Sequence, residues 1–295
     1  MREIVVISGK GGTGKTSITA AFAHLAEKAM VCDLDVDAPD LHMLLAPVVE
    51  EEHAFRSGHE AVIDQERCTK CGVCAELCRF GAVREDQGKY VVDSLRCEGC
   101  KVCVHFCPDQ AVNFVEKHCG QWYSSTMRFG PMIHAQLFPG EENSGRLVAL
   151  LKKEAHQRAK KLGLSLILCD GTPGIGCPVI SSLSGANLAV VITEPTPSGR
   201  HDLERVADLC LHFRIPVAVI VNKSDLNPEN SREIGAYCRE KGHGLLGMLP
   251  YDEQMTKAMI LGKCITEMSD SHFGDELRGI WEKIVTYPVG PLRLA

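Results

Sequence analysis

The sequence predicts an α/β protein with a doubly wound, mostly parallel sheet into which a smaller α+β domain is inserted. Two observations support this prediction. Over residues 1–50 and 118–295, short apolar runs alternate with longer amphipathic segments, as strands and helices do in a parallel sheet. Between them, residues 51–117 hold eight of the chain's 15 cysteines, in two groups of identical spacing.

The composition limits the class of protein. With 295 residues and 45% apolar side chains, the chain can form one large domain or two smaller ones around a buried core. The net charge of −6 predicts no nucleic-acid partner, and the apolar runs are too short to predict a membrane span or a membrane partner. The N-terminus shows no signal-peptide pattern, so we expect a cytoplasmic protein whose cysteines serve as thiolate ligands rather than disulfides.

A glycine-rich loop follows the first predicted strand. Residues 4–8 are apolar and β-branched, GKGGTGKT follows at 9–16, and the next segment has apolar residues at helical spacing. Strand, loop and helix in this order are the context of a Walker A motif, in which Lys15 reaches the β- and γ-phosphates and Thr16 ligates Mg²⁺. A purely structural glycine turn is the alternative. The predicted nucleotide-binding residues of the loop are Gly11, Gly12, Thr13, Gly14, Lys15, Thr16 and Ser17.

A second lysine, Lys10, stands near the start of this loop. The pattern K-G-G-x-G-K-T resembles the deviant Walker A motif of the MinD/ParA/nitrogenase iron protein superfamily. In that superfamily the first lysine reaches the nucleotide of a partner subunit. The resemblance therefore implies a catalytic role for Lys10 in a nucleotide-sandwich dimer, either a homodimer or a heterodimer with a related ATPase. The alternative is a solvated lysine, since loop lysines are usually exposed.

The second predicted strand, at residues 30–33, ends in the acidic sequence DLDVDAPD. Carboxylates at the C-terminal end of a parallel strand lie where α/β sheets bind ligands. The D-x-D sequence matches switch I of the same superfamily, and the resemblance implies that Asp35 orients the attacking water. Asp40 is a candidate N-cap for a short helix at 41–45.

Residues 48–64 are polar and predict a linker with one hairpin strand. A duplication follows, with an offset of 29 residues between its two cysteine groups. Their spacing, C-x2-C-x2-C-x3-C, is that of bacterial two-cluster ferredoxins, in which the fourth cysteine of each run ligates the other cluster. The resemblance implies two [4Fe–4S] clusters in a bacterial-ferredoxin-like domain. The implied ligand sets are Cys68, Cys71 and Cys74 with Cys107, and Cys97, Cys100 and Cys103 with Cys78.

Two structural zinc sites are the rival interpretation of these cysteines. Zinc ribbons pair C-x2-C knuckles across a long gap, whereas here four cysteines fall within eleven residues. The spacing therefore favours iron–sulfur clusters over zinc.

The main domain resumes after the cysteines, with two predicted strands at 121–137, an amphipathic helix at 147–162 and a buried strand at 164–169. This strand is closed by Asp170 in DGTPGIGCP, which resembles switch II of the superfamily. The resemblance implies that Asp170 binds Mg²⁺ through water and that the Gly174 amide senses the γ-phosphate. A loop cap is the alternative role for Asp170.

Two further cysteines remain open. Cys177 lies seven residues beyond Asp170. In the nitrogenase iron protein a cysteine at that offset ligates a cluster shared between subunits, but the second cysteine of that site has no match here. A buried or switch-lining thiol is the alternative, and Cys119, at the predicted domain junction, is likewise open as a further metal ligand.

The last predicted strands, at 188–192, 216–221 and 245–249, are followed by a helix at 272–286. Asn222 begins NKSD and matches the superfamily's adenine-side asparagine, while Pro250 matches the segment that packs near the base. NKSD also matches the guanine-reading motif of GTPases. The lysine-bearing Walker A favours ATP over GTP, and a simple turn is the alternative for NKSD.

Nearly the whole chain resembles MinD-superfamily ATPases that contain an inserted ferredoxin domain. The resemblance implies a dimeric, Mg-dependent ATPase that couples its nucleotide state to electron transfer to, or metallocluster assembly on, a partner protein. A cluster carrier or scaffold and a redox-sensing regulatory or partitioning module are the alternatives. Carriers of this superfamily use a C-terminal C-x-x-C, and its absence here favours clusters that stay in place.

Overall fold

The computed structural model describes residues 1–288 and divides them between two compact units. The larger unit comprises Met1–His53, Trp122–Gln136 and the described chain from Ser144 onward, and the smaller comprises Ala54–Gln121 and Leu137–Asn143. The predicted insert, 51–117, is shorter than the smaller unit, which also includes residues 118–121 and 137–143. The second of these segments returns to the unit, where Phe138 N donates a hydrogen bond to the Cys119 carbonyl. Residues 289–295 of the predicted larger domain lie outside the described residues.

The helices and strands of residues 1–288 have the following bounds. The strands are β1 (Arg2–Ile7), β2 (Ala29–Asp33), β3 (Val48–Ile63), β4 (Val83–Asp86), β5 (Lys89–Val92), β6 (Val112–Met127), β7 (Gly130–Leu137), β8 (Leu166–Asp170), β9 (Leu188–Thr193), β10 (Val217–Val221) and β11 (Gly244–Met248). The helices are α1 (Lys15–Leu25), α2 (Leu41–Leu45), α3 (Val73–Glu76), α4 (Val102–His105), α5 (Ser144–Lys161), α6 (Cys177–Leu183), α7 (Pro197–His212), α8 (Pro228–Lys241), α9 (Glu253–Ile260), the 3₁₀ turn η1 (Ile265–Glu267) and α10 (His272–Thr286).

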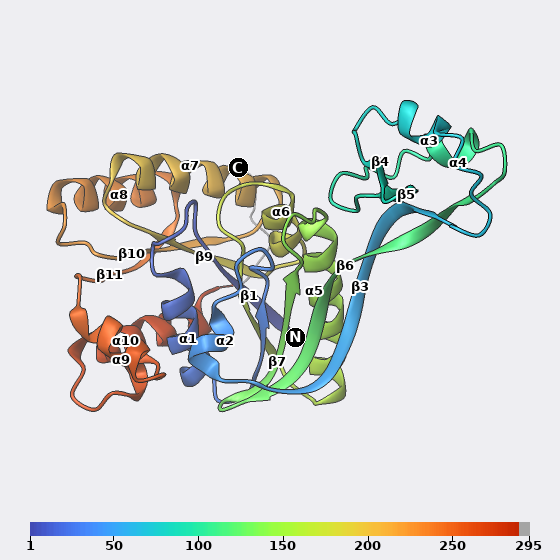
Figure 1. Ribbon diagram of the computed structural model, residues 1–295. Coiled ribbons are helices and arrows are strands. Elements are labelled where there is room, and N and C mark those ends of the chain that lie inside the picture. The colour runs from blue at the N-terminus through green and yellow to red at the C-terminus, as the bar shows by residue number, and fades with distance from the viewer. Residues whose placement is uncertain (289–295) are drawn as a thin grey trace. The chain divides into compact units, whose positions relative to one another are not determined.

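Within residues 1–288, nine strands form one sheet in the order β11-β10-β9-β1-β8-β2-β7-β6-β3 (Figure 1). Neighbouring strands from β11 to β7 are parallel, and a two-residue turn joins β6 to β7. The predicted α/β class with a mostly parallel sheet is confirmed. The chain leaves β1 toward β2 on one side and leaves β8 toward β9 on the other. The C-terminal ends of β1 and β8 are therefore the switch point at which such sheets bind ligands.

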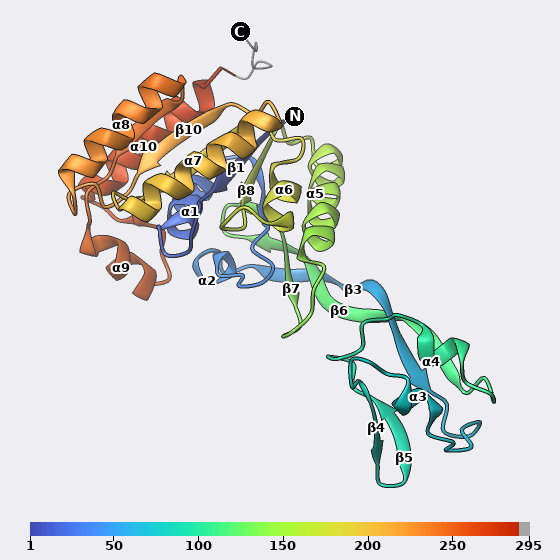
Figure 2. The same cartoon turned by 90° about the horizontal axis from the view of Figure 1, so that it is seen from above.

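Helices cover both faces of the parallel part of this sheet (Figure 2). On one face lie α1 and α10, where the rings of Phe22 and Trp281 stack with centroids 5.3 Å apart. On the other lie α6, α7 and α8, which bury Val179, Leu203 and Ile234. Strands β1, β9 and β10 are continuous apolar runs, because a parallel sheet between two helical layers leaves neither face to water. No helix among residues 1–288 is long and apolar enough to cross a membrane.

The segment predicted as a linker is instead the strand β3, which is 16 residues long and matched in length by β6. Its first five residues, VVEEE, are all exposed. From Phe55 onward the burial follows a two-residue period, and Phe55, Ala61 and Ile63 are buried. Alternating apolar residues are the sequence signal of a half-buried strand. The exposed residues VVEEE at the start of β3 do not show this alternation.

The duplication is repeated in the backbone of the smaller unit. Each repeat has a one-turn helix, α3 or α4, shortly before its fourth cysteine, and the β4–β5 hairpin lies between the two. Positive φ angles recur 29 residues apart, at Lys70 (62°) and Gly99 (58°), Gly72 (81°) and Lys101 (68°), and Gly81 (62°) and Gln110 (50°). The two repeats therefore share local conformation as well as cysteine spacing.

Candidate functional site

The glycine-rich loop lies at the switch point, between β1 and α1. Gly14 is the N-cap of α1 with a φ of 89°, a conformation that glycine adopts without strain. A Cβ at this position would also lie 2.5 Å from Asn222 Nδ2, which donates a hydrogen bond to the Thr13 carbonyl at 2.8 Å. The Thr13 hydroxyl is buried and has no hydrogen-bond partner among residues 1–288, so it is available to a ligand.

A cleft opens above this loop at the C-terminal edge of the sheet. It is lined by Ser8, Gly11, Gly12, Thr13, Gly14, Lys15, Thr16, Ser17, Asp35, Asp37, Ala38, Asp40, Met43, Leu44, Thr172, Pro173, Gly176, Pro178 and Met259. The structure thus gathers the predicted loop residues and Asp35 around one cavity. Among the described residues, Asp170, Gly174, Asn222 and Pro250 are not part of this lining. A nucleotide fits here because the loop amides and a helix N-terminus meet the cleft, as anionic phosphates require.

Lys15 is the central cation of the cleft and is almost fully buried. Its Nζ lies 2.9 Å from Asp170 Oδ2 and 3.6 Å from Asp35 Oδ2. Two hydroxyls complete the surroundings of Asp170, since Thr16 donates to Oδ2 and Thr19 donates to Oδ1, each at 2.8 Å. Thr16 and Asp170 therefore present oxygen ligands side by side, which is the donor set that Mg²⁺ prefers. Sequence reasoning missed Thr19, which lies one helical turn beyond Lys15.

Burial and charge perturb the titration of this cluster. Burial lowers the pKa of Lys15, but the negative charges of Asp170, Asp35 and Asp33 outweigh it and raise the pKa, so Lys15 stays protonated. Burial raises the pKa of Asp35 to about 6, although Lys15 opposes the shift. Burial, with Asp170 nearby, raises the pKa of Asp33 well above its ordinary value. The carboxylate oxygens of Asp33 accept hydrogen bonds from the backbone N–H groups of Asp35 and Leu41.

The two switch segments are joined directly. The Thr172 hydroxyl donates to the Leu34 carbonyl at 3.0 Å, which links the end of β8 to the residue before Asp35. Gly174, with a φ of 96°, donates its N–H to the Ser8 carbonyl at 2.9 Å. The amide predicted to sense the γ-phosphate is therefore bound, in this state, to the residue directly before the phosphate loop. Thr172 was not predicted, because its role depends on a strand pairing that the sequence does not display.

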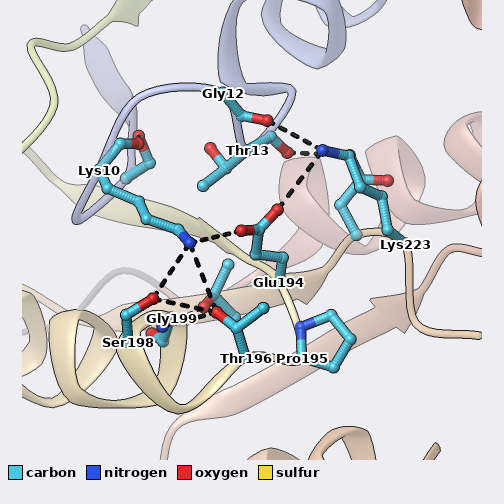
Figure 3. A network of polar contacts seen from close by, with 12 residues as sticks. Lys10, Gly12, Thr13, Glu194, Pro195, Thr196, Ser198, Gly199 and Lys223 are labelled. Atoms are coloured by element: carbon cyan, nitrogen blue, oxygen red, sulfur yellow. Dashed lines mark hydrogen bonds and ion pairs between the residues drawn. The ribbon is translucent and has the colours of Figure 1, made fainter. Parts of the chain in front are cut away.

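Lys10 is bound within its own chain (Figure 3). Its Nζ lies 2.5 Å from Glu194 Oε1 and donates to Ser198 Oγ at 3.2 Å and to Thr196 Oγ1 at 3.4 Å. These three partners lie between the end of β9 and the first turn of α7. In this structure Lys10 is thus neither solvated freely nor placed in its own cleft.

Glu194 connects Lys10 to the NKSD segment. Lys223 Nζ lies 3.4 Å from Glu194 Oε2 and donates to the Gly12 carbonyl at 3.0 Å (Figure 3). Burial raises the pKa of Glu194, but hydrogen bonds and charge from the two lysines outweigh it and lower the pKa. The Glu194 carboxylate therefore stays ionised. Through Lys10 and Lys223 it links the start of the phosphate loop to Gly12.

The predicted base-side residues lie next to each other. Ser224 N donates to the Leu249 carbonyl at 2.8 Å, and Tyr251 N donates to Asp225 Oδ1 at 2.6 Å. These bonds hold NKSD beside Pro250. They also engage one oxygen of Asp225, the residue that would read guanine in a GTPase motif, with the chain's own backbone.

The eight cysteines of the smaller unit line two cavities. Each cavity contains three cysteines of one repeat and the fourth of the other. One is lined by Cys68, Cys71, Cys74 and Cys107, and the other by Cys97, Cys100, Cys103 and Cys78. Within residues 1–288, no three His, Cys, Asp or Glu side chains lie close enough to hold a single metal ion. A four-iron cluster takes four cysteine ligands, and each cavity supplies four.

The crossing cysteine of each set has the same surroundings. Ala82 N donates to Cys78 Sγ at 3.3 Å, and Ala111 N, 29 residues later, donates to Cys107 Sγ at 3.2 Å. Burial raises the pKa of Cys78, but hydrogen bonds from backbone N–H groups, that of Ala82 foremost, outweigh it and lower the pKa. Such N–H donors favour the thiolate form that iron binds.

A family model described as the CobQ/CobB/MinD/ParA nucleotide binding domain matches residues 4–265, from β1 to the start of η1. The chain belongs to this family. Its family membership confirms the nucleotide-binding class that the glycine-rich loop predicts.

Similar proteins extend over most of this length. An uncharacterized protein of Methanocaldococcus jannaschii is 30% identical over 96% of this chain and 96% of that protein. A Drosophila ananassae protein named cytosolic Fe-S cluster assembly factor Nubp1 homolog is 22% identical over 96% of this chain and 81% of its own length. Among solved structures, the septum site-determining protein MinD of Pyrococcus horikoshii, complexed with Mg-ADP, has a TM-score of 0.59 at 16% identity. That alignment covers 97% of this chain and 96% of the MinD chain. At this identity the likeness shows the fold alone.

The remaining candidate cysteines of this CobQ/CobB/MinD/ParA family member differ in exposure. Cys177 is exposed at the first position of α6, directly after switch II. Cys119 is fully buried, and its thiol donates to the Ser57 carbonyl at 3.1 Å. Burial, with Glu141 nearby, raises the pKa of Cys119, which disfavours the thiolate that a metal would need.

Proposed function

We propose that this protein is a dimeric, Mg-dependent ATPase that carries two [4Fe–4S] clusters and couples its nucleotide state to a redox or metallocluster partner protein. The observation that supports this most is the crossing of cysteines between repeats: each cavity combines three cysteines of one repeat with the fourth of the other. In two-cluster ferredoxins the clusters are held in this crossed manner. A cytoplasmic location remains our expectation.

In the proposed hydrolysis, the chain's own groups position ATP and stabilise charge. The loop amides and Lys15 hold the phosphates, and Thr16 and Asp170 hold Mg²⁺, which neutralises phosphate charge when bound. Asp35 accepts a hydrogen bond from the attacking water, which its pKa of about 6 permits at neutral pH. Lys10 of the partner subunit adds positive charge at the transferred phosphoryl group.

The clusters are proposed as resident cofactors rather than cargo. Carriers of the superfamily that this chain resembles use a C-terminal C-x-x-C pair, which this sequence lacks. The two cysteines nearest the C-terminus, Cys238 and Cys264, are buried, and burial raises the pKa of Cys264 to about 12. Resident clusters suit electron transfer to a partner. Similarity to a protein named as an Fe–S cluster assembly factor supports assembly on a partner as the second candidate.

Anaerobic reconstitution of the full chain tests the proposal. We expect about eight irons and eight sulfides per chain, as two four-iron clusters require. We also expect ATP hydrolysis that needs Mg²⁺ and rises with protein concentration as dimers form. Zinc in place of iron, or binding of ATP without hydrolysis, would contradict the proposal. Reduction of a partner with the chain's iron retained indicates electron transfer, whereas loss of iron to an apo-protein indicates a carrier.

A further inference from the structure

The second cysteine repeat presents an exposed groove along α4. Its lining includes Val102 and Phe106, which are 36% and 57% exposed. Cys100 and Cys107 also line it. Since these two cysteines belong to different predicted ligand sets, the groove brings both candidate clusters to one surface of the smaller unit.

The groove is cationic although the chain as a whole is acidic. Arg67, Lys101 and His105 line it, and none of its described lining residues is an aspartate or glutamate. The net charge of the chain is −6. Apolar side chains next to charged ones are typical of protein–protein contacts, in which the charges guide a partner of opposite sign.

The first repeat serves as an internal comparison for this groove. At the positions of Lys101, His105 and Phe106 it has Gly72, Glu76 and Leu77. Lys101 has a φ of 68°, where an L-residue is strained and where the first repeat uses glycine with a φ of 81°. The lysine adds to the groove a cation that the first repeat lacks at the equivalent position.

We propose that this groove is the docking site of an acidic electron-carrier protein. The inference rests on the proposed iron–sulfur function and adds the class of partner and the face that receives it. The acidic rim of the carrier would meet Lys101 and Arg67, and its apolar centre would cover Phe106. In each encounter one electron would leave the carrier's reduced cofactor and enter a cluster of this chain, with no bond formed or broken.

The chemistry of the groove favours a protein over other polyanions. Nucleic-acid binding depends on neutralising many phosphates, and only two permanent cations line this surface. An exposed phenylalanine that lines a groove is instead the kind of side chain that anchors a protein interface.

The experiment measures binding of oxidised flavodoxin, an acidic carrier, to the full chain reconstituted anaerobically, with surface plasmon resonance as readout. Phe106→Ala should raise Kd about tenfold or more. Lys101→Gly, which installs the residue of the first repeat and relieves strain, should raise Kd about two- to fivefold and reduce the salt dependence of the on-rate.

The matched control is Leu77→Ala, the equivalent of Phe106→Ala in the first repeat, and it should change Kd by less than about twofold. Iron content must equal that of the wild type in every variant. Equal effects of Phe106→Ala and Leu77→Ala, no effect of either, or no binding of flavodoxin would overturn the proposal. Preference for a basic cytochrome c, an oligonucleotide or anionic vesicles would overturn it as well. Failure to bind iron would reject the proposed function itself and this inference with it, whereas normal iron with an unchanged Kd would reject only the inference.

Discussion

Glu194 forms the ion pair that holds Lys10 in this structure. A lysine that is to reach a partner's nucleotide must first leave Glu194, Thr196 and Ser198. Glu194→Gln removes the charge but keeps the size, so the lysine is held less strongly. We expect ATP-dependent dimers of Glu194→Gln to form with a Kd lowered about two- to fivefold, as measured by sedimentation equilibrium, since partly exposed ion pairs contribute up to ~1 kcal/mol.

The control for this variant is Glu204→Gln. Glu204 lies on the helix that follows Glu194, α7, where it pairs with Arg200 and does not contact Lys10. It should leave dimerisation unchanged. Weaker dimers of Glu194→Gln would show instead that Glu194 positions Lys10 for its role rather than competing for it.

Asp35 makes hydrolysis depend on pH. Its pKa of about 6 means that it accepts a hydrogen bond from water above this pH and is protonated below it. We expect the initial rate of ATP hydrolysis to fall about tenfold per pH unit below pH ~6. Asp35→Asn should be slow at every pH, without this inflection. An unchanged inflection in that variant would assign the titration to another group.

The same pKa predicts a change in stability. Folding raises the pKa of Asp35 from 3.8 to about 6. Protonated Asp35 therefore adds to the free energy of unfolding below pH ~4, and this stabilising contribution is lost as the pH rises to about 6. An asparagine does not titrate. Asp35→Asn should therefore match the wild type at low pH and exceed it by up to about 3 kcal/mol above pH ~6, as measured by urea unfolding. Equal stability at pH 8 would show that Asp35 is not desolvated.

At the scale of elements, the two cysteine repeats depend on each other. Cys107 lies in the second repeat, but it lines the cavity of Cys68, Cys71 and Cys74. Cys107→Ser should remove the cluster of the first repeat and reduce the iron from about eight to about four per chain. Cys78→Ser should have the same effect on the other cavity. Cys119→Ser is the matched control, because Cys119 is a buried cysteine outside both cavities, and it should retain all the iron.

Elements were predictable from the sequence to different degrees. The phosphate loop and the cysteine spacing are local patterns, and the structure places the loop residues around one cavity and the cysteines around two. The segment 48–64 was predicted as a linker with one hairpin strand, and the full length of β3 was missed because Glu50, Glu51 and Glu52 are exposed, whereas a strand is recognised by its buried face. Thr19 and Thr172 were missed because their roles arise from contacts between distant segments. A threonine on a helix gives no sign that Asp170 lies 2.8 Å from its hydroxyl.

At the scale of the whole molecule, the nucleotide residues and the cysteines belong to different compact units. Strands β3 and β6 each contribute residues to both units. Each unit buries its own core, and none of the described residues that line the nucleotide cleft belongs to the smaller unit. The proposed ATPase and cluster functions are therefore separable by mutation, although they are coupled in the proposed activity.

Lys15→Arg tests this separation without disturbing the charge balance of the cleft. Alanine would leave Asp170, Asp35 and Asp33 without their central cation, and the loss of stability would confuse the result. Arginine keeps the charge, but its planar fork does not reproduce the compact ammonium group that holds the phosphates. We expect hydrolysis to fall by about 10² or more, while iron content and the iron–sulfur absorbance stay at wild-type values. Joint loss of hydrolysis and iron would show that the cysteine-rich unit needs an intact nucleotide cleft to fold or to load.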